Sequence, residues 1–243
     1  MKAWNKNYLS LLNACVGVGM TAKLHATSFR HFYSKKSVWP NLILDITSFD
    51  DTLKNRVKNL PRTTTFLLPK ANTESICLEG FETLNFSQGL WYEMQAEVNE
   101  QWRNLNFENT KIVQTEEDLH TWLSIVENVL LGGGKLDYEG IKGLWNKKQI
   151  YLVLGLYGDK AVSTSMFHFC GQHLGLYFVV THPEYRGYGL GTQLTQYAYK
   201  LGYNLGAQTC VLQATEMGKL VYLKQGYTIT DEVDVFSYLK KEL

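Results

Sequence analysis

Apolar and polar residues alternate in a regular series along the C-terminal half of this chain, from about residue 108 onward. Short apolar runs of strand length alternate with segments whose apolar residues recur every three or four positions, the spacing of one helix face. The pattern predicts helices over residues 116–130, 138–146, 190–205 and 217–225, and strands over residues 150–157, 161–169, 174–180, 210–213, 227–229 and 233–238. This alternation is typical of an α/β or α+β domain with a helix-covered sheet.

The first 107 residues have a less regular pattern. It predicts helices over residues 4–15, 22–32 and about 53–60, and strands over residues 41–45, 64–68, 80–82 and 90–94. We therefore divide the chain into an N-terminal α/β domain, residues 1–107, and a second domain, residues 108–243. No linker rich in proline, glycine or serine separates them, so we expect the two to pack together.

The amino-acid composition indicates a globular protein and argues against general nucleic-acid binding. Of 243 residues, 45% are hydrophobic, which is enough for a substantial core, and the formal net charge of +1 gives no basic excess for nucleic-acid binding. No apolar run approaches the length of a membrane span. The apolar stretch near the N-terminus is interrupted by Asn13 and lacks a clear cleavage site, so we expect a buried helix end rather than a signal peptide.

The cysteines are Cys15, Cys77, Cys170 and Cys210. They are far apart and form no Cys-x-x-Cys pair, which argues against a zinc ribbon or a disulfide scaffold and favours a reducing, cytoplasmic location. We expect no metal and no membrane partner.

The most informative segment runs from Thr181 to Thr192. It follows the apolar strand 176–180 and precedes a helical pattern, so it reads as strand, glycine-rich turn and helix N-terminus. Such a turn gathers unpaired backbone N–H groups at the positive end of a helix dipole, which suits a phosphate or pyrophosphate. The alternative is a glycine-rich turn with no ligand.

The glycine spacing distinguishes between phosphate ligands. Thr192 stands where a dinucleotide fingerprint needs its last glycine, and no Gly-Lys-Ser/Thr of a nucleotide P-loop is present. Pro183-x-x-Arg186-Gly187-x-Gly189-x-Gly191 instead resembles the acetyl-CoA signature of the GNAT acetyltransferase superfamily. A second block, residues 211–227, resembles that superfamily's later strand, turn and tyrosine-bearing helix before Gly-Tyr.

Together the two blocks make residues 110–240 similar to a GNAT domain. The resemblance implies a mixed sheet, flanked by helices, that splays open between the strand before the glycine turn and the strand 210–213. The N-terminal half weakly resembles the degenerate first half of tandem GNAT proteins, through residues 78–82 and 89–94. An unrelated α+β domain or an extended subdomain is the alternative.

The resemblance implies acetyl-CoA as the acetyl donor and direct transfer to a primary amine of a small molecule or peptide. It places the pantetheine arm of acetyl-CoA on the backbone of Val179, Val180 and Thr181. The pyrophosphate meets the turn, which consists of Arg186, Gly187, Tyr188, Gly189, Leu190, Gly191 and Thr192. Tyr222 matches the general acid that protonates the leaving thiolate; the alternative is a tyrosine that only packs its helix.

The general base is not evident, because the strand 174–180 carries no acidic residue. His173 and His168 are candidates because histidine titrates near neutrality, although either can equally be an ordinary partly buried residue. Asp137 and Glu139 are candidates for binding a cationic substrate or are solvated loop charges. The two histidines do not form a convincing metal pair, because strand and turn positions do not aim both rings at one point.

Two other functions remain open: a non-catalytic acyl-CoA-binding module that kept the phosphate turn, and a structural protein with an empty turn. The absent strand carboxylate favours the first of these, and Tyr222 argues against it. Besides the coenzyme A thioester and the amine, we expect no partner beyond a second copy of the chain, so the protein is expected to be a monomer or a homodimer.

Overall fold

A computed structural model describes residues 2–60, 64–69 and 86–238. Eleven strands of these residues form one mixed sheet in the order β1-β2-β3-β4-β11-β5-β10-β9-β8-β7-β6. The strands are β1 (Ala22–His25), β2 (Arg30–Tyr33), β3 (Leu42–Leu44), β4 (Thr64–Pro69), β5 (Phe86–Glu97), β6 (Thr110–Ile112), β7 (Tyr151–Tyr157), β8 (Lys160–Cys170), β9 (His173–Thr181), β10 (Thr209–Thr215) and β11 (Thr228–Tyr238). The predicted α/β class with a helix-flanked mixed sheet is confirmed.

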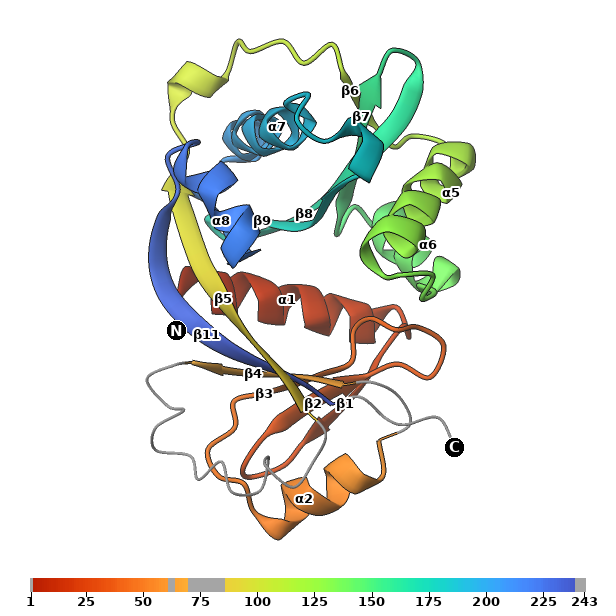
Figure 1. The fold of residues 1–243 in the computed structure, drawn as a ribbon, viewed down its shortest axis with the longest axis vertical. Helices are drawn as coiled ribbons and strands as arrows, with labels where there is room; N and C mark the ends of the chain where they lie inside the picture. Colours follow the sequence, from red (N-terminus) through yellow and green to blue (C-terminus); the bar gives the residue numbers. More distant parts are fainter. Residues whose placement is uncertain (1, 61–63, 70–85, 239–243) are drawn as a thin grey trace.

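Helices cover both faces of the sheet. They are α1 (Ala3–Gly17), α2 (Asp51–Lys58), α5 (Glu116–Ile125), α6 (Tyr138–Asn146), α7 (Leu190–Leu205) and α8 (Glu216–Leu223). On one face, α1, α5 and α6 share a hydrophobic core, while α7 packs into a second core on the opposite face. Figure 1 shows α1 lying between the upper part of the molecule and the strands β1 to β4 below it. No helix of the described residues is long and apolar enough to cross a membrane.

At the centre of the sheet, strands from the two halves of the chain alternate. The C-terminal strand β11 lies between β4 and β5, and β5 in turn lies between β11 and β10; all of these contacts are antiparallel. Figure 1 shows β5 and β11 running side by side along the molecule. The predicted boundary at residue 107 stays a prediction, but the sheet is continuous across it, because β5 belongs to residues 1–107 and pairs with β10.

The strand β11 also completes a third hydrophobic core. Phe236 of β11 packs with residues of β3, α2 and β4, among them Ile43, Leu53 and Phe66. This core is therefore built from residues far apart in the sequence, and β11 supplies one of its walls. Asp50 caps α2 by accepting a hydrogen bond from the Leu53 N–H at 2.9 Å, which fixes the helix over this core.

Helix α1 is fixed to the sheet by a buried amide. The Asn7 Nδ2 atom donates to the carbonyl oxygens of His168 and His173, at 2.9 Å each, and its Oδ1 accepts from the Tyr177 hydroxyl at 2.6 Å. Gly175 allows this approach, since a Cβ there would lie 2.0 Å from Asn7 Oδ1. The Asn7 side chain thus links α1 to both β8 and β9.

Several sequence predictions are corrected. Residues 22–32 form no helix; they belong to the β1–β2 hairpin, closed by the Ala26 N–H donating to the Phe29 carbonyl. Phe29 and Phe32 are three residues apart, a spacing found on one helix face, but a bend at Thr27 and Ser28 separates two short strands. The two predicted C-terminal strands are one strand, β11, with a bulge near residue 230. The predicted strand 80–82 lies outside the described residues.

We expect Phe236→Ala to lower the free energy of unfolding by about 3–5 kcal/mol, because it opens a cavity in a core that β11 completes. Phe236 is 5% exposed, whereas Ile229 on the same strand is 42% exposed, so Ile229→Ala is a control expected to change stability little. Urea unfolding measures both. Equal effects of the two substitutions would contradict the role assigned to β11.

Candidate active site

The sheet opens between β9 and β10. The parallel pairing of these strands runs from His173–Thr209 to Leu176–Leu212 and extends no further among the described residues. Both strands continue past that point, β9 to Thr181 and β10 to Thr215. Backbone groups along the facing edges of these two ends are therefore available to a third, extended chain.

A β-bulge turns the end of β9. Between the pairs Met166–Tyr177 and Thr164–Val180, β9 has one residue more than β8, and Phe178 takes a φ of 51°. Positive φ is uncommon for a bulky residue and re-aims the strand at a bulge. The Ser165 carbonyl, which lies within the bulge, accepts a hydrogen bond from the Trp122 indole N–H at 3.0 Å. The α5 side chain thus supplies a hydrogen-bond donor to the carbonyl of a residue that the bulge leaves without a partner on β9.

Val179 lies in this bulge, and Val180 and Thr181 directly follow it, on the part of β9 that is no longer paired with β10. Val180 and Thr181 keep their pairing to β8, reinforced by the Ser163 hydroxyl, which lies 2.7 Å from the Val180 carbonyl oxygen and 2.8 Å from the Thr181 hydroxyl. One edge of Val180 and Thr181 is therefore hydrogen-bonded to β8, while the other edge faces the opening.

The glycine turn follows at once. Gly187 and Gly189 take φ values of 85° and 79°, a region that disfavours other residues. Gly189 is the N-cap of α7, no side chain caps this helix, and the first intrahelical bond runs from the Gln193 N–H to the Gly189 carbonyl. The N–H groups of Leu190, Gly191 and Thr192 thus point out of an uncapped helix end beside the opening.

Two side chains border the turn. The Arg186 Nε donates to the Thr181 carbonyl at 3.2 Å, which holds this exposed cation over the end of β9. Tyr188 is exposed, and its ring centroid lies 4.9 Å from that of Tyr157 on β7. The structure therefore brings the predicted residues of the turn together with Val179, Val180 and Thr181.

Tyr222 lies on α8, which follows directly from β10. Its half-buried ring packs edge-on against Tyr227, with 5.7 Å between ring centroids. Burial raises the pKa of the Tyr222 phenol to about 12, so the hydroxyl carries its proton at neutral pH. It belongs to the same core as α7, on the side of the sheet that carries the glycine turn.

The two histidines do not lie at the opening. His173 begins β9 within the paired region, four residues before Tyr177, and its Nδ1 contacts the Thr209 hydroxyl at 2.7 Å. His168 is buried, with both ring nitrogens occupied by the Gln149 carbonyl and the Ser10 hydroxyl. Burial lowers the pKa of both imidazoles. Asp137 and Glu139 lie at the start of α6, away from β10.

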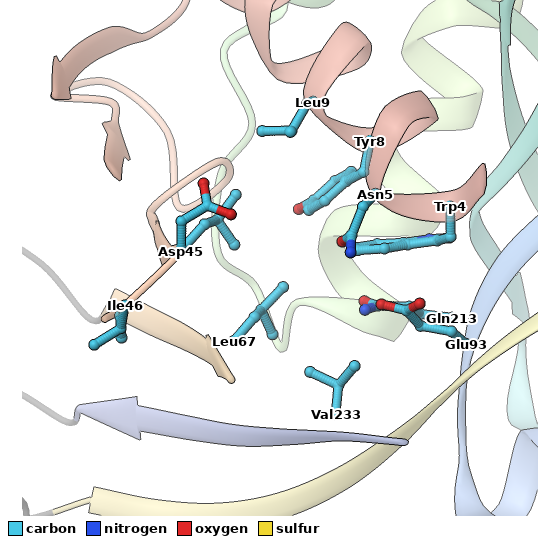
Figure 2. Close-up of a pocket in the computed structure, with 11 residues that line it drawn as sticks. Trp4, Asn5, Tyr8, Leu9, Asp45, Ile46, Leu67, Glu93, Gln213 and Val233 are labelled. Atoms are coloured by element: carbon cyan, nitrogen blue, oxygen red, sulfur yellow. The ribbon is translucent and has the colours of Figure 1, made fainter. Parts of the chain in front are cut away.

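On the α1 face, next to the opening, there is a cavity of about 90 Å³. It is lined by Trp4, Asn5, Tyr8, Leu9, Leu44, Asp45, Ile46, Leu67, Glu93, Gln213 and Val233. Figure 2 shows Trp4 and Asn5 of α1 facing Glu93 and Gln213. Gln213 is the first residue of β10 beyond the last pair with β9, so the cavity adjoins the point where the strands separate.

Three residues that line this cavity each have a buried polar atom with no hydrogen-bond partner among the described residues. These atoms are the Glu93 Oε2, the Gln213 Nε2 and the Trp4 Nε1. Burying a polar atom without a partner costs about 1–3 kcal/mol, so three among the residues that line one small cavity are unusual unless a polar ligand completes them. Glu93 and Gln213 are direct neighbours across the β5–β10 ladder.

Glu93 is 1% exposed, and its pKa is raised to about 7. Burial is the main cause; the carboxylate of Asp231, opposite it on β11, adds to the rise, and Lys2, which pairs with Asp231, opposes it. Sequence reasoning placed a strand here without selecting Glu93. The one available signal was a lone acid inside the apolar run Leu90–Met94, which alternation alone assigns to an outward-facing position.

Comparison with known proteins agrees with this geometry. The sequence profile of the Acetyltransferase (GNAT) family matches residues 91–227. No curated protein sequence matches the chain.

Solved structures share the fold over the whole length. A GCN5-related N-acetyltransferase from Kribbella flavida is similar with a TM-score of 0.68 and 14% identity, covering 100% of this chain and 98% of that chain. A GCN5-related N-acetyltransferase-like protein from Streptococcus suis has a TM-score of 0.63 and 12% identity, covering 94% of this chain and 92% of the other. At such low identities the likeness concerns the fold, and it includes the N-terminal half.

Proposed function

The chain belongs to the GNAT acetyltransferase family, and we propose that it moves an acetyl group directly from acetyl-CoA to a primary amine of a small molecule or peptide. The observation that carries this proposal is the separation of β9 from β10 directly beside the uncapped N-terminus of α7. An extended ligand with a phosphate group at one end fits that pair of features, and acetyl-CoA is such a ligand.

The pyrophosphate would bind at the glycine turn. Unpaired N–H groups of Leu190, Gly191 and Thr192 and the positive end of the α7 dipole favour an anion there, and Arg186 adds a cation. An added Cβ on Gly187, Gly189 or Gly191 would meet no atom of the described residues within 4 Å, apart from its own chain neighbours and helix backbone, so the space beside these three glycines is open. The N–H groups are therefore accessible to a phosphate.

The pantetheine arm would continue from the turn into the opening. It carries two amides, which can pair with the free edge of Val179, Val180 and Thr181 in the manner of an added strand. A backbone N–H of this edge would then polarise the thioester carbonyl, where negative charge develops during attack by the amine.

Tyr222 would protonate the departing thiolate. It lies on the helix that follows the β10 end of the opening, and its raised pKa keeps the phenol protonated at neutral pH, so the hydroxyl has a proton to donate as the C–S bond breaks. In this scheme the glycine turn binds the donor, the free edge of β9 orients it, and Tyr222 completes thiol release.

A charge placed in the turn tests donor binding. We expect Gly191→Asp to leave the fold intact, since a carboxylate in the first turn of α7 favours the helix dipole by about 0.3–1 kcal/mol. The same carboxylate repels a pyrophosphate, so stabilisation by acetyl-CoA should be lost. For the unchanged protein, ligand at about 100-fold above Kd contributes about 2.7 kcal/mol. Thermal melting with and without acetyl-CoA measures this.

Gly191→Asn is the matched control, because it has the same size and no charge. It should keep more of the acetyl-CoA-induced shift in melting temperature than Gly191→Asp. An undiminished shift in Gly191→Asp would place the phosphates elsewhere, and no shift in the unchanged protein would contradict donor binding itself.

Removal of one hydroxyl tests the thiol-release step. We expect Tyr222→Phe to lower kcat by about 10²–10⁴-fold, the usual contribution of a general acid, while leaving acetyl-CoA binding unchanged. Release of free thiol, followed over an amine panel, is the measurement, and Tyr203→Phe on α7 is the control. A full rate in Tyr222→Phe would show that another group protonates the thiolate. Tight acetyl-CoA binding without turnover of any amine would identify a non-catalytic acyl-CoA-binding module.

A further inference from the structure

We infer that the cavity between α1 and the sheet is the acceptor site, that it takes a primary ammonium group on an apolar stem, and that Glu93 accepts the proton of that group. This inference rests on the proposed function, because it identifies the second substrate of the same reaction. It concerns a residue of the N-terminal half that matches no part of the acetyl-CoA signature.

Position is the first argument. Gln213 lines the cavity and directly follows Leu212, the last residue of β10 paired with β9, and Glu93 is the neighbour of Gln213 on β5. On the other strand, Tyr177 follows the last paired residue, and the cavity-lining ring of Tyr8 stacks on it at 5.6 Å. A thioester held between the separated strands would therefore face the cavity through the opening.

The shape of the cavity is the second argument. Its volume of about 90 Å³ well exceeds the ~10–15 Å³ that a single water molecule needs, so it has room for several non-hydrogen atoms. Aliphatic side chains line one part, namely Leu9, Leu44, Ile46, Leu67 and Val233. The aromatic rings of Trp4 and Tyr8 form another wall, with centroids 4.7 Å apart. Such walls suit an apolar stem, and aromatic faces attract an ammonium group.

Charge is the third argument. The charged groups near Glu93 are Asp231 on β11, Lys2 ahead of α1 and Asp45 after β3. Lys2 forms an ion pair with Asp231, and Asp45 forms one with Arg30. Glu93 is thus the carboxylate in the cavity that no cation of the described residues neutralises. A buried carboxylate in this position lacks a positive partner, which an ammonium group supplies.

The proton balance follows from this arrangement. The Glu93 carboxylate accepts one proton from the ammonium group and leaves a neutral amine. The nitrogen lone pair forms a bond to the thioester carbonyl carbon, the C–S bond breaks, and its electron pair stays on sulfur. The sulfur takes a proton from the Tyr222 hydroxyl, which regains one through water as the nitrogen loses its second proton. The products are the acetamide, the free thiol of coenzyme A and protonated Glu93, which releases its proton to solvent.

The experiment compares Glu93→Gln with the unchanged protein. We expect kcat/KM for the amine to fall by about 10²–10⁴-fold, with acetyl-CoA binding unchanged, because the amide keeps the shape and cannot accept the proton. In the unchanged protein kcat/KM should rise with pH through a value near 7, where Glu93 loses its proton, and Glu93→Gln should lack that limb. Glu97→Gln is the matched control, an exposed glutamate on the same strand.

A binding measurement separates this inference from the proposed function. Propylamine and the side chain of Nα-acetyl-lysine amide should raise the melting temperature of the unchanged protein but not of Glu93→Gln, and propanol should raise neither. The two amines distinguish a free small molecule from a lysine side chain. If the unchanged protein turns over no amine but shows this protection, the acceptor site stands and the acetyl-transfer proposal fails. If Glu93→Gln keeps normal turnover or normal protection, or if no amine protects the unchanged protein, the inference is overturned.

Stability provides a check on the variant itself. Because the pKa of Glu93 is raised by folding, the folded protein holds a proton that the unfolded chain has lost between about pH 4.5 and 7. The contribution of this group therefore weakens as pH rises through that window. The melting temperature of Glu93→Gln, relative to the unchanged protein, should be higher at pH 8 than at pH 5. Should this variant not fold, Gln213→Leu changes the neighbour of Glu93 in the same cavity wall, and the same turnover and melting measurements apply to it.

Discussion

The antiparallel pairing of β5 with β11 is the interaction on which the rest of this structure depends. It joins a strand that ends the N-terminal half to the strand that ends the chain, and each then pairs outward, β5 with β10 and β11 with β4. The two ends of the molecule thereby become one sheet. The position of β11 beside β4 also lets Phe236 fill a core otherwise made of N-terminal residues. Neither half has its observed sheet without a strand contributed by the other.

The pairings of β10 with β5 and of β9 with β8 explain how the sheet can be open in the middle. A strand that leaves one neighbour exposes unpaired backbone groups, which is costly unless its other edge is held. β10 leaves β9 after Leu212, yet its pairing with β5 continues to Thr215. On the other side, β9 stays paired with β8 across the bulge at Phe178. Each strand that borders the opening is thus hydrogen-bonded to a neighbour along its other edge.

The two faces of the sheet differ near the opening. One face carries the uncapped end of α7 and Tyr222, which suit a phosphate-bearing thioester. The other carries a small cavity beneath α1, with the unneutralised carboxylate of Glu93. Asn7 holds α1 in place over β8 and β9, so a helix remote in sequence from the glycine turn defines the second side. A reaction between an anionic donor and a cationic acceptor fits this division.

The sequence by itself predicted most of the local elements and the glycine turn ahead of α7. Helix spacing predicted α1, α5 and α7, and the glycines of the turn predicted an anion-binding helix end, because periodicity and positive φ are local properties. The sequence prediction was wrong where contacts between distant residues set the structure. Residues 22–32 were predicted as a helix but form a hairpin, and the alternation of residues assigns Glu93 to the surface. Only the tertiary structure buries Glu93, because β11, β10 and α1 close over it from three separate parts of the chain. Burial, and with it the shifted pKa of that carboxyl, is a property of packing and not of the order of residues.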